Sequence, residues 1–180
     1  MPSKTSKYRT DSYPYKVYTA FVTQEGTDTE DSINSGLLTI GRTYRINEIS
    51  GGMDFLNVGA PDNNLNTSFV ATGQIPNSWG TGATYTLAYS AGAPVVKVLD
   101  NTIGDIYWTY VLEGTYRANF NGGFPLLMTF CPSVVVINEG GDGAKTVVLL
   151  PSDSEDYVEI KTFNANGLLK NTPLEIRVYQ

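Results

Sequence analysis

Hydrophobic and polar residues alternate with a period of two along much of this chain. In residues 16–23 we expect Val17 and Phe21 to point inward, and residues 43–49 repeat the pattern through Tyr44 and Ile46. Successive side chains of a strand point to opposite faces of a sheet, so this period predicts half-buried β-strands. No window of a dozen residues has the apolar spacing of an amphipathic helix, and we therefore expect essentially no helix.

The pattern recurs in shorter segments, which are separated by clusters of Gly, Asn, Asp and Pro. These residues favour tight turns, because Gly and Asn tolerate positive φ and Pro fixes φ. Short strands at such spacing are typical of an antiparallel β-sandwich, a jelly roll or a barrel. The further segments predicted as strands are residues 68–71, 84–89, 95–99, 106–111, 115–120, 126–130, 134–137, 146–150, 157–162 and 174–179.

The segment Val-Val-Val-Ile at residues 134–137 has no alternation at all. A continuous apolar run is typical of a strand that is buried on both faces. Two explanations stay open: the segment is the central strand of its sheet, or it becomes covered when copies of the chain assemble. Left uncovered at a sheet edge, it would promote aggregation.

Composition and charge support a β protein and disfavour a nucleic-acid partner. The chain has 180 residues, enough for one domain, and its 12 Tyr and 18 Gly suit strands and turns. A net charge of −6 leaves few cations to neutralise phosphates, so we expect no nucleic-acid partner. The sequence has no run of about 18 apolar residues and no secretion signal, so we expect no membrane span and folding in a cytoplasm.

One local exception to the acidic character is the amino terminus, where Lys4, Lys7 and Arg9 lie among Ser, Thr and Pro. Almost nothing apolar there could be buried, so residues 1–12 are predicted to form a flexible basic arm. The arm is either a frayed end or a segment that docks on an acidic surface of a partner. We name its three basic residues as candidate partner-binding residues.

The chain contains no histidine, which removes imidazole triads and most zinc sites. The Gly-rich segment 140–145 precedes a predicted strand rather than a helix, so we interpret it as a hairpin turn and not as a phosphate site. Asp54, Asp100, Asp105 and Glu113 could supply a glycosidase pair, yet nothing in the sequence brings two of them together. We therefore predict a protein that is not an enzyme and binds no cofactor.

Acidic loops at residues 28–31, 62–64 and 153–156 offer oxygen ligands of the kind that calcium prefers. None has the regular spacing of a calcium-binding loop, so we interpret them as solvated turns and assign no metal ligand. Cys131 is the only cysteine and lies in an apolar stretch. It is predicted to be a buried, unreactive thiol.

The aromatic residues have two interpretations. Trp108 and Tyr110 share one face of the predicted strand 106–111, opposite to Tyr107. They belong to a cross-strand core or to a platform that binds a sugar or a protein partner. Trp79 follows a Pro turn and is a further candidate partner-binding residue, which either lies over a small core or forms an exposed contact.

Residues 38–87 carry three motifs. Ile-Gly-x-x-Tyr-x-Ile spans residues 40–46, Gly-x-Asp-Phe-x-Asn-Val-Gly-Ala spans residues 52–60, and Phe-x-Ala-Thr-Gly-x-x-Pro-x-x-Trp spans residues 69–79. This segment resembles a short module that recurs in predicted proteins of tailed phages. It departs from the module where Met53 replaces an acidic residue and where Leu65 and Asn66 stand in a loop that usually carries Gly.

The flanking segments resemble a second phage-associated pattern, a Tyr-rich strand ending Gln-x-Gly-Thr that leads directly into Ala-Pro-x-x-x-Val-Leu-x-Asn-Thr-Leu-Gly. Residues 15–27 and 93–104 match its two halves, so we interpret the first module as an insertion. The resemblance implies a β-sandwich or jelly-roll-like domain formed by residues 13–37 and 90–180, with a small inserted β module at residues 38–89.

The two resemblances further imply a virion protein of tailed phages, including the crAss-like and flavobacterial phages, without a defined activity. We expect a head-fibre, decoration or tail-associated protein that is located in the virion and contacts other virion proteins. The alternative is a carbohydrate-binding module for host adhesion, whose ligand is a surface glycan. Because few lysines or prolines protect the sheet edges, we also expect a homo-oligomer, a trimer if the protein is a fibre.

Overall fold

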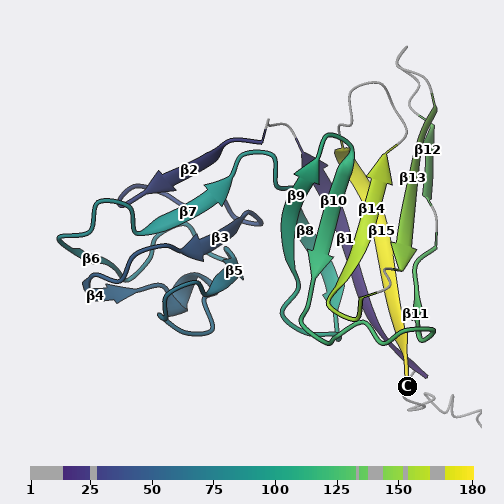
Figure 1. The fold of residues 1–180 in the computed structure, drawn as a ribbon, viewed down its shortest axis with the longest axis horizontal. Coiled ribbons are helices and arrows are strands. Elements are labelled where there is room, and N and C mark those ends of the chain that lie inside the picture. Colours follow the sequence, from purple (N-terminus) through teal and green to yellow (C-terminus); the bar gives the residue numbers. More distant parts are fainter. Residues whose placement is uncertain (1–13, 25–27, 133, 138–143, 152–153, 163–168) are drawn as a thin grey trace, which may run out of the picture.

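The computed structural model describes residues 14–24, 28–132, 134–137, 144–151, 154–162 and 169–180. Its described part consists of two β lobes that lie side by side (Figure 1). All pairs of neighbouring strands in it are antiparallel, and its one helical element is the 3-10 turn η1, Leu56–Val58. The prediction of an all-β chain is confirmed.

The larger lobe is a sandwich of two sheets, with strand orders β11-β15-β1-β8 and β12-β13-β14-β10-β9. The class of fold is therefore as predicted, while a jelly-roll connectivity stays a prediction. The strands of the first sheet are β1 Tyr15–Gln24, β8 Val95–Asn101, β11 Thr129–Phe130 and β15 Leu169–Tyr179. Those of the second sheet are β9 Tyr107–Leu112, β10 Thr115–Asn119, β12 Val134–Ile137, β13 Ala144–Pro151 and β14 Tyr157–Thr162.

The two sheets face each other across a shared hydrophobic core. Tyr18 of β1 and Ile176 of β15 enter it from one sheet, and Trp108, Tyr116 and Ile160 enter it from the other. Burial raises the pKa of Tyr18 to about 12, although its hydroxyl hydrogen bond with Trp108 acts in the opposite direction. The Trp108 indole N–H donates to the Tyr18 hydroxyl at 3.1 Å, which satisfies both polar groups inside the core.

The alternation predicted for β1 is present, but its inward face is not the predicted one. Tyr18, Ala20 and Val22 are buried, whereas Val17 and Phe21 lie on the opposite face and are only half-buried. Both faces of β1 carry apolar side chains, so the pattern alone did not distinguish them. The hydrogen bond that Tyr18 makes inside the core offsets the free-energy cost of burying its hydroxyl group.

The smaller lobe has a four-stranded sheet in the order β2-β7-β3-β5 and a two-stranded sheet of β4 and β6. Tyr44, Phe55 and Phe69 are among the buried residues of its own core. Strand β2, which belongs to the range 13–37 that the resemblance placed in the sandwich, pairs with β7 of this lobe. The bounds are β2 Glu30–Ile33, β3 Thr43–Ile46, β4 Gly51–Asp54, β5 Ser68–Val70, β6 Ser78–Thr81 and β7 Leu87–Ser90.

Hydrogen bonds and apolar packing hold the small lobe against the sandwich. Val96 N of β8 donates to Gly41 O at 2.9 Å, and Trp108 N of β9 donates to Thr43 Oγ1 at 2.9 Å. Val70 of β5 packs against the sandwich core. Gly41 has a φ of +84°, and a Cβ added to it would lie 2.1 Å from Val96 O. The close approach of the two lobes therefore requires glycine at position 41.

The apolar segment Val134–Ile137 forms β12, which pairs with β13 from Val134↔Val147 to Ile137↔Ala144. Among the described strands, β13 is its only neighbour, so β12 lies at the edge of its sheet. The interpretation as a central strand is therefore wrong. The apolar run did not distinguish the two positions, because β-branched residues favour strands at sheet edges as well as at sheet centres. Of the predicted turn 140–145, residues 140–143 lie outside the described part of the chain.

Candidate binding cleft between the lobes

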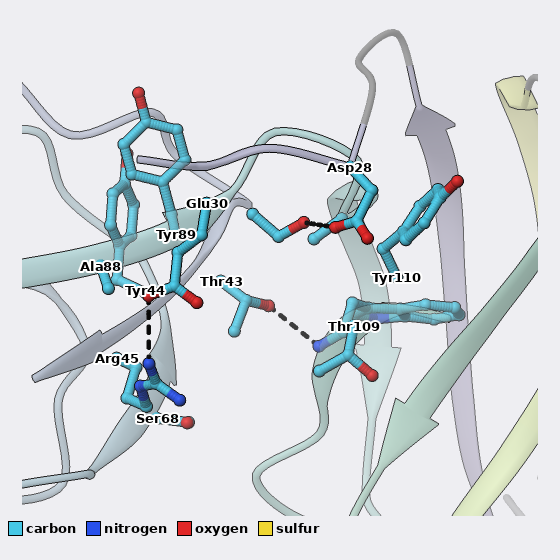
Figure 2. A pocket seen from close by; sticks show the side chains of 13 residues that line it. Asp28, Glu30, Thr43, Tyr44, Arg45, Ser68, Ala88, Tyr89, Thr109 and Tyr110 are labelled. Atoms are coloured by element: carbon cyan, nitrogen blue, oxygen red, sulfur yellow. Dashed lines mark hydrogen bonds and ion pairs between the residues drawn. The ribbon is translucent and has the colours of Figure 1, made fainter. Parts of the chain in front are cut away.

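A cleft of about 260 Å³ opens where the two lobes meet. Figure 2 shows side chains from β2, β3 and β7 of the small lobe on one side of it, and side chains from β9 of the sandwich on the other. The small lobe is inserted between β1 and β8, so the chain crosses the junction twice. This topology brings together residues that are far apart in sequence.

Strand β3 forms the floor of the cleft, with Thr43 and Tyr44 buried and Arg45 exposed along it. Tyr44 is buried in the small lobe, where its hydroxyl accepts a hydrogen bond from Thr39 N at 2.9 Å. Arg45, the next residue, is exposed. Thr43 Oγ1 accepts the bond from Trp108 N already described, so internal contacts hold the floor in place.

Tyr89 and Tyr110 form walls from the two lobes, and both rings are half-buried. Tyr89 packs edge-on against Tyr44, with ring centroids 5.4 Å apart, and the Arg42 guanidinium lies 4.7 Å from the Tyr89 centroid. Tyr110 packs against Tyr116 at 5.9 Å. These contacts fix the orientation of both rings, so each offers a rigid apolar face and a hydroxyl group.

Charged side chains surround the mouth of the cleft. Ser90 Oγ donates to Asp28 Oδ1 at 3.3 Å, and Arg45 Nη2 donates to Glu30 Oε1 at 3.2 Å. The Arg45–Glu30 pair is exposed, so it adds at most about 1 kcal/mol to stability. Carboxylate oxygens beside tyrosine faces form an arrangement that can bind the hydroxyls and the apolar face of a sugar ring.

A second hollow, of about 400 Å³, lies at the same junction and is more apolar. Phe69 and Ile106 are buried at its base, while Val98 of β8 is exposed beside them. Asp105 and Asn101 lie at its border. Apolar side chains with few polar neighbours suit contact with protein rather than with sugar.

The structure places the sequence-predicted aromatic residues in the two cores. Trp108 is completely buried and Tyr110 is half-buried on the same face, as predicted, and cross-strand packing accounts for both. Tyr107, on the other face, lines the second hollow. Trp79 packs edge-on against Phe55 at 5.5 Å over the core of the small lobe, so the prediction that it lies over a small core is confirmed.

The carboxylates that could have formed a glycosidase pair lie at different places in the fold. Asp54 ends β4, Asp100 lies in β8, Asp105 precedes β9, and Glu113 lies in the β9–β10 hairpin. Among the described residues, no group of three or more Asp, Glu or Cys side chains is placed to hold a metal ion. Of the acidic loop 153–156, residue 153 is outside the described part.

Asp54 and Asp62 stabilise loops of the small lobe, and this predicts a loss of stability in acid. Hydrogen bonds from Asn77 and Leu56 N lower the pKa of Asp54, and those from Thr67 and Asn64 N lower the pKa of Asp62.

Because these pKa values are lower in the folded state, the contribution is fully present above the unfolded pKa of about 4 and is lost as pH falls through the folded values. We expect the double variant D54N/D62N to lose less unfolding free energy than the wild type between about pH 5 and pH 2. Urea titrations at each pH measure the free energy of unfolding. The control is D105N, which changes an exposed carboxylate on the sandwich. Equal losses of unfolding free energy in all three proteins would contradict the prediction.

Cys131 is buried, as predicted, and burial raises the pKa of its thiol to about 12. Only the thiolate reacts quickly with disulfide reagents. We expect labelling of the native protein by an aromatic disulfide at pH 8 to be at least roughly 100-fold slower than in denaturant. Rapid, complete labelling of the folded protein would show instead that the thiol is accessible.

The candidate residues Lys4, Lys7 and Arg9 lie outside the described residues, so their partner-binding role stays a prediction. The sequence did not single out Arg45, Tyr89 or Tyr110 as members of one site. No spacing in the sequence signals the proximity of β3, β7 and β9, since β9 belongs to another sheet and meets β3 where the two lobes pack together. A tertiary contact prediction, rather than a motif, could have found the cleft.

No helix in the described part of the chain has the length and apolar character needed to cross a membrane. Comparison with models of protein families, with curated proteins and with solved structures finds no match to this chain.

Proposed function

We propose that this chain is a non-enzymatic structural component of a tailed-phage particle, a head-fibre, decoration or tail-associated protein that acts through protein contacts. The observation that carries the proposal is that the motif residues shared with the phage module form the scaffold of the small lobe. A motif whose residues build the scaffold accounts for a recurring fold. The function of each protein with that fold then depends on its surface residues, which can vary.

The polar motif residues Asp54 and Asn57 make internal hydrogen bonds, in part with Asn77, which stands at a variable position of the motif. Asn77 Nδ2 donates to Asp54 Oδ2 at 2.9 Å, and Asn57 Nδ2 donates to Ile75 O at 2.8 Å. Asn57 Oδ1 in turn accepts a bond from Asn77 N at 2.9 Å. These bonds tie β4, η1 and the loop before β6 together, which explains why Asp and Asn occupy those motif positions.

The aromatic and glycine positions of the motifs have structural roles as well. Phe55 stacks on Phe69 at 6.3 Å and contacts Trp79. Gly59 has a φ of +107°, and a Cβ there would lie 2.6 Å from Val70 O. Since these side chains and glycines serve the core and the turns, the resemblance favours a recurrent building block over an inherited catalytic site.

Reconstitution of particles tests this proposal. Particles produced without the chain are incubated with the purified, labelled protein and centrifuged through a density gradient. We expect the labelled protein to sediment with the particles at a saturable ratio, and unlabelled protein to compete with it. Labelled protein that stays at the top of the gradient would contradict a structural role. An unrelated β-sandwich of similar acidity serves as the control for non-specific retention.

A second candidate function, glycan binding for host adhesion, is favoured by the cleft between the lobes. Tyr89 and Tyr110 line it together with Asp28 and Glu30. In a glycan array, binding to one sugar class that Y89A loses and Y85A keeps would support this function, because Tyr85 is exposed on the same lobe outside the cleft. No retained glycan with the wild-type protein would exclude it.

A further inference from the structure

The loop after β10 begins with a tight turn at residues 120–123. Gly123 N donates to Phe120 O at 2.8 Å, which closes the turn. Gly122 has a φ of +64°, whereas the φ of Asn121 is not positive. A positive φ at the third position alone is typical of a type II turn, which favours glycine there. Asn121 and Gly122 are both exposed, so the turn presents an Asn-Gly pair to the solvent.

Asparagine is a chemically labile residue, most of all before glycine, which has no Cβ to hinder attack by its own backbone nitrogen. That nitrogen gives its proton to a base and forms a bond with Cγ of the asparagine, which closes a succinimide ring. The bond from Cγ to Nδ2 breaks, and the leaving nitrogen takes up a proton and departs as ammonia. Water then opens the ring to aspartate or to isoaspartate.

In this protein a carboxylate holds the nitrogen that would have to attack. Gly122 N donates to Oδ1 of Asp156, the residue that directly precedes β14, at 2.9 Å. The negative charge of the acceptor disfavours loss of the amide proton, and a hydrogen bond to a charged group is stronger than one between neutral groups. The bond therefore opposes the first step of ring closure.

Further contacts attach the same turn to the segment before β14. Phe120 N donates to Asp156 O at 2.8 Å. Phe124 N donates to Glu155 O at 2.9 Å. The Phe120 ring packs edge-on against Phe124, with centroids 6.2 Å apart, and a Cβ added to Gly123 would lie 1.6 Å from its Cδ1. The turn is thus held closely on both sides, and ring closure requires it to open first.

We propose that Asn121 is a site of spontaneous deamidation and that Asp156 controls its rate by holding Gly122 N. The site reacts only in the fraction of molecules in which the turn has opened. Deamidation adds a carboxylate to a turn that is bonded to Asp156, and isoaspartate also lengthens the backbone of the turn by a carbon atom. Either product weakens the attachment of the turn to the segment before β14, because like charges repel and the tight packing leaves no room for a longer backbone. This modification does not depend on the proposed structural function.

Peptide mapping by mass spectrometry, during incubation of the full chain in mildly alkaline buffer, tests this control. We expect Asp156→Ala to deamidate at Asn121 at least roughly tenfold faster than the wild type, because the charged acceptor that keeps the turn closed is lost. Asp156→Asn keeps an oxygen acceptor without the charge, so its rate should lie between the two. Glu155→Gln is the matched control and should react at the wild-type rate, since Glu155 bonds to the turn through its carbonyl oxygen.

A second Asn-Gly pair, Asn166 and Gly167, lies outside the described residues and serves as the internal reference in every sample. Asp156→Ala should leave its rate unchanged, and in urea Asn121 should react equally fast in all four proteins. Equal rates at Asn121 in the folded wild type and Asp156→Ala would overturn the proposal, as would a wild-type rate that is the same in buffer and in urea. Acceleration of both pairs by Asp156→Ala would also overturn it, because general unfolding would then account for the reaction.

Discussion

Replacing Gly41 with alanine is expected to lower the free energy of unfolding by about 3–5 kcal/mol. The added Cβ would lie 2.1 Å from Val96 O, which is part of the backbone and cannot rotate away. The φ of +84° adds strain for any residue with a Cβ. Since Gly41 O also accepts the bond from Val96 N, the small lobe must move away from β8 to relieve the overlap.

Gly36→Ala is the matched control for this prediction. Gly36 has a φ of +95°, and nothing lies within 4 Å of its added Cβ, so it reports the cost of positive φ without an overlap. We expect it to cost about 1 kcal/mol. Urea titrations followed by circular dichroism measure both variants. Equal losses at the two positions would show that the contact between Gly41 and β8 does not hold the lobes together.

Replacing Trp108 with alanine is expected to lower the free energy of unfolding by about 3–5 kcal/mol as well. Trp108 is completely buried between the sheets, and its indole N–H is the partner of the buried Tyr18 hydroxyl. The substitution leaves a cavity and an unsatisfied hydroxyl group, and both effects destabilise the core.

Trp79 offers a contrast, because it is only half-buried and belongs to the small lobe. We expect Trp79→Ala to cost about half as much.

The chain has two tryptophans, so W79F leaves a fluorescent probe in the sandwich and W108F leaves one in the small lobe. Titrations of these two variants also report whether the lobes unfold together. A loss below about 1 kcal/mol for Trp108→Ala would contradict the placement of this side chain at the centre of the core.

Period-two alternation was sufficient to predict the strands that have one buried face. Strands β9, β10 and β14 lie close to their predicted bounds. Buried Val158 and Ile160 alternate with half-buried residues in β14, and half-buried Arg117 separates buried Tyr116 and Ala118 in β10, whereas Trp108 is the one buried residue of β9. Strands β2, β4 and β6 were missed. The first begins Glu-Asp and has no buried residue, while the other two contain glycines, among them Gly52 and Gly80 with positive φ. Neither composition favours a strand, so these three segments are strands because of the strands with which they pair.

Among the predicted strands that are shorter in the structure, two end early for clear local reasons. The strand predicted at residues 43–49 ends at Ile46, because Asn47 N and Glu48 N donate to Thr86 O instead of continuing the ladder. Of residues 126–130, only Thr129 and Phe130 are in a strand, since Leu127 takes part in the turn. Residues 126–128 were predicted as part of a strand, whereas they lie outside β11 and their side chains are exposed.

Quantitative mass spectrometry of purified particles tests whether the chain is built into a phage particle, as we propose. Particles are purified from a producing culture through two successive gradients, and the peptides of this chain are counted relative to those of the most abundant shell protein. We predict that the chain is present in many copies per particle and that its ratio to the shell protein stays constant across the particle peak. A chain that is abundant in the infected-cell lysate and absent from the particle peak would contradict the claim.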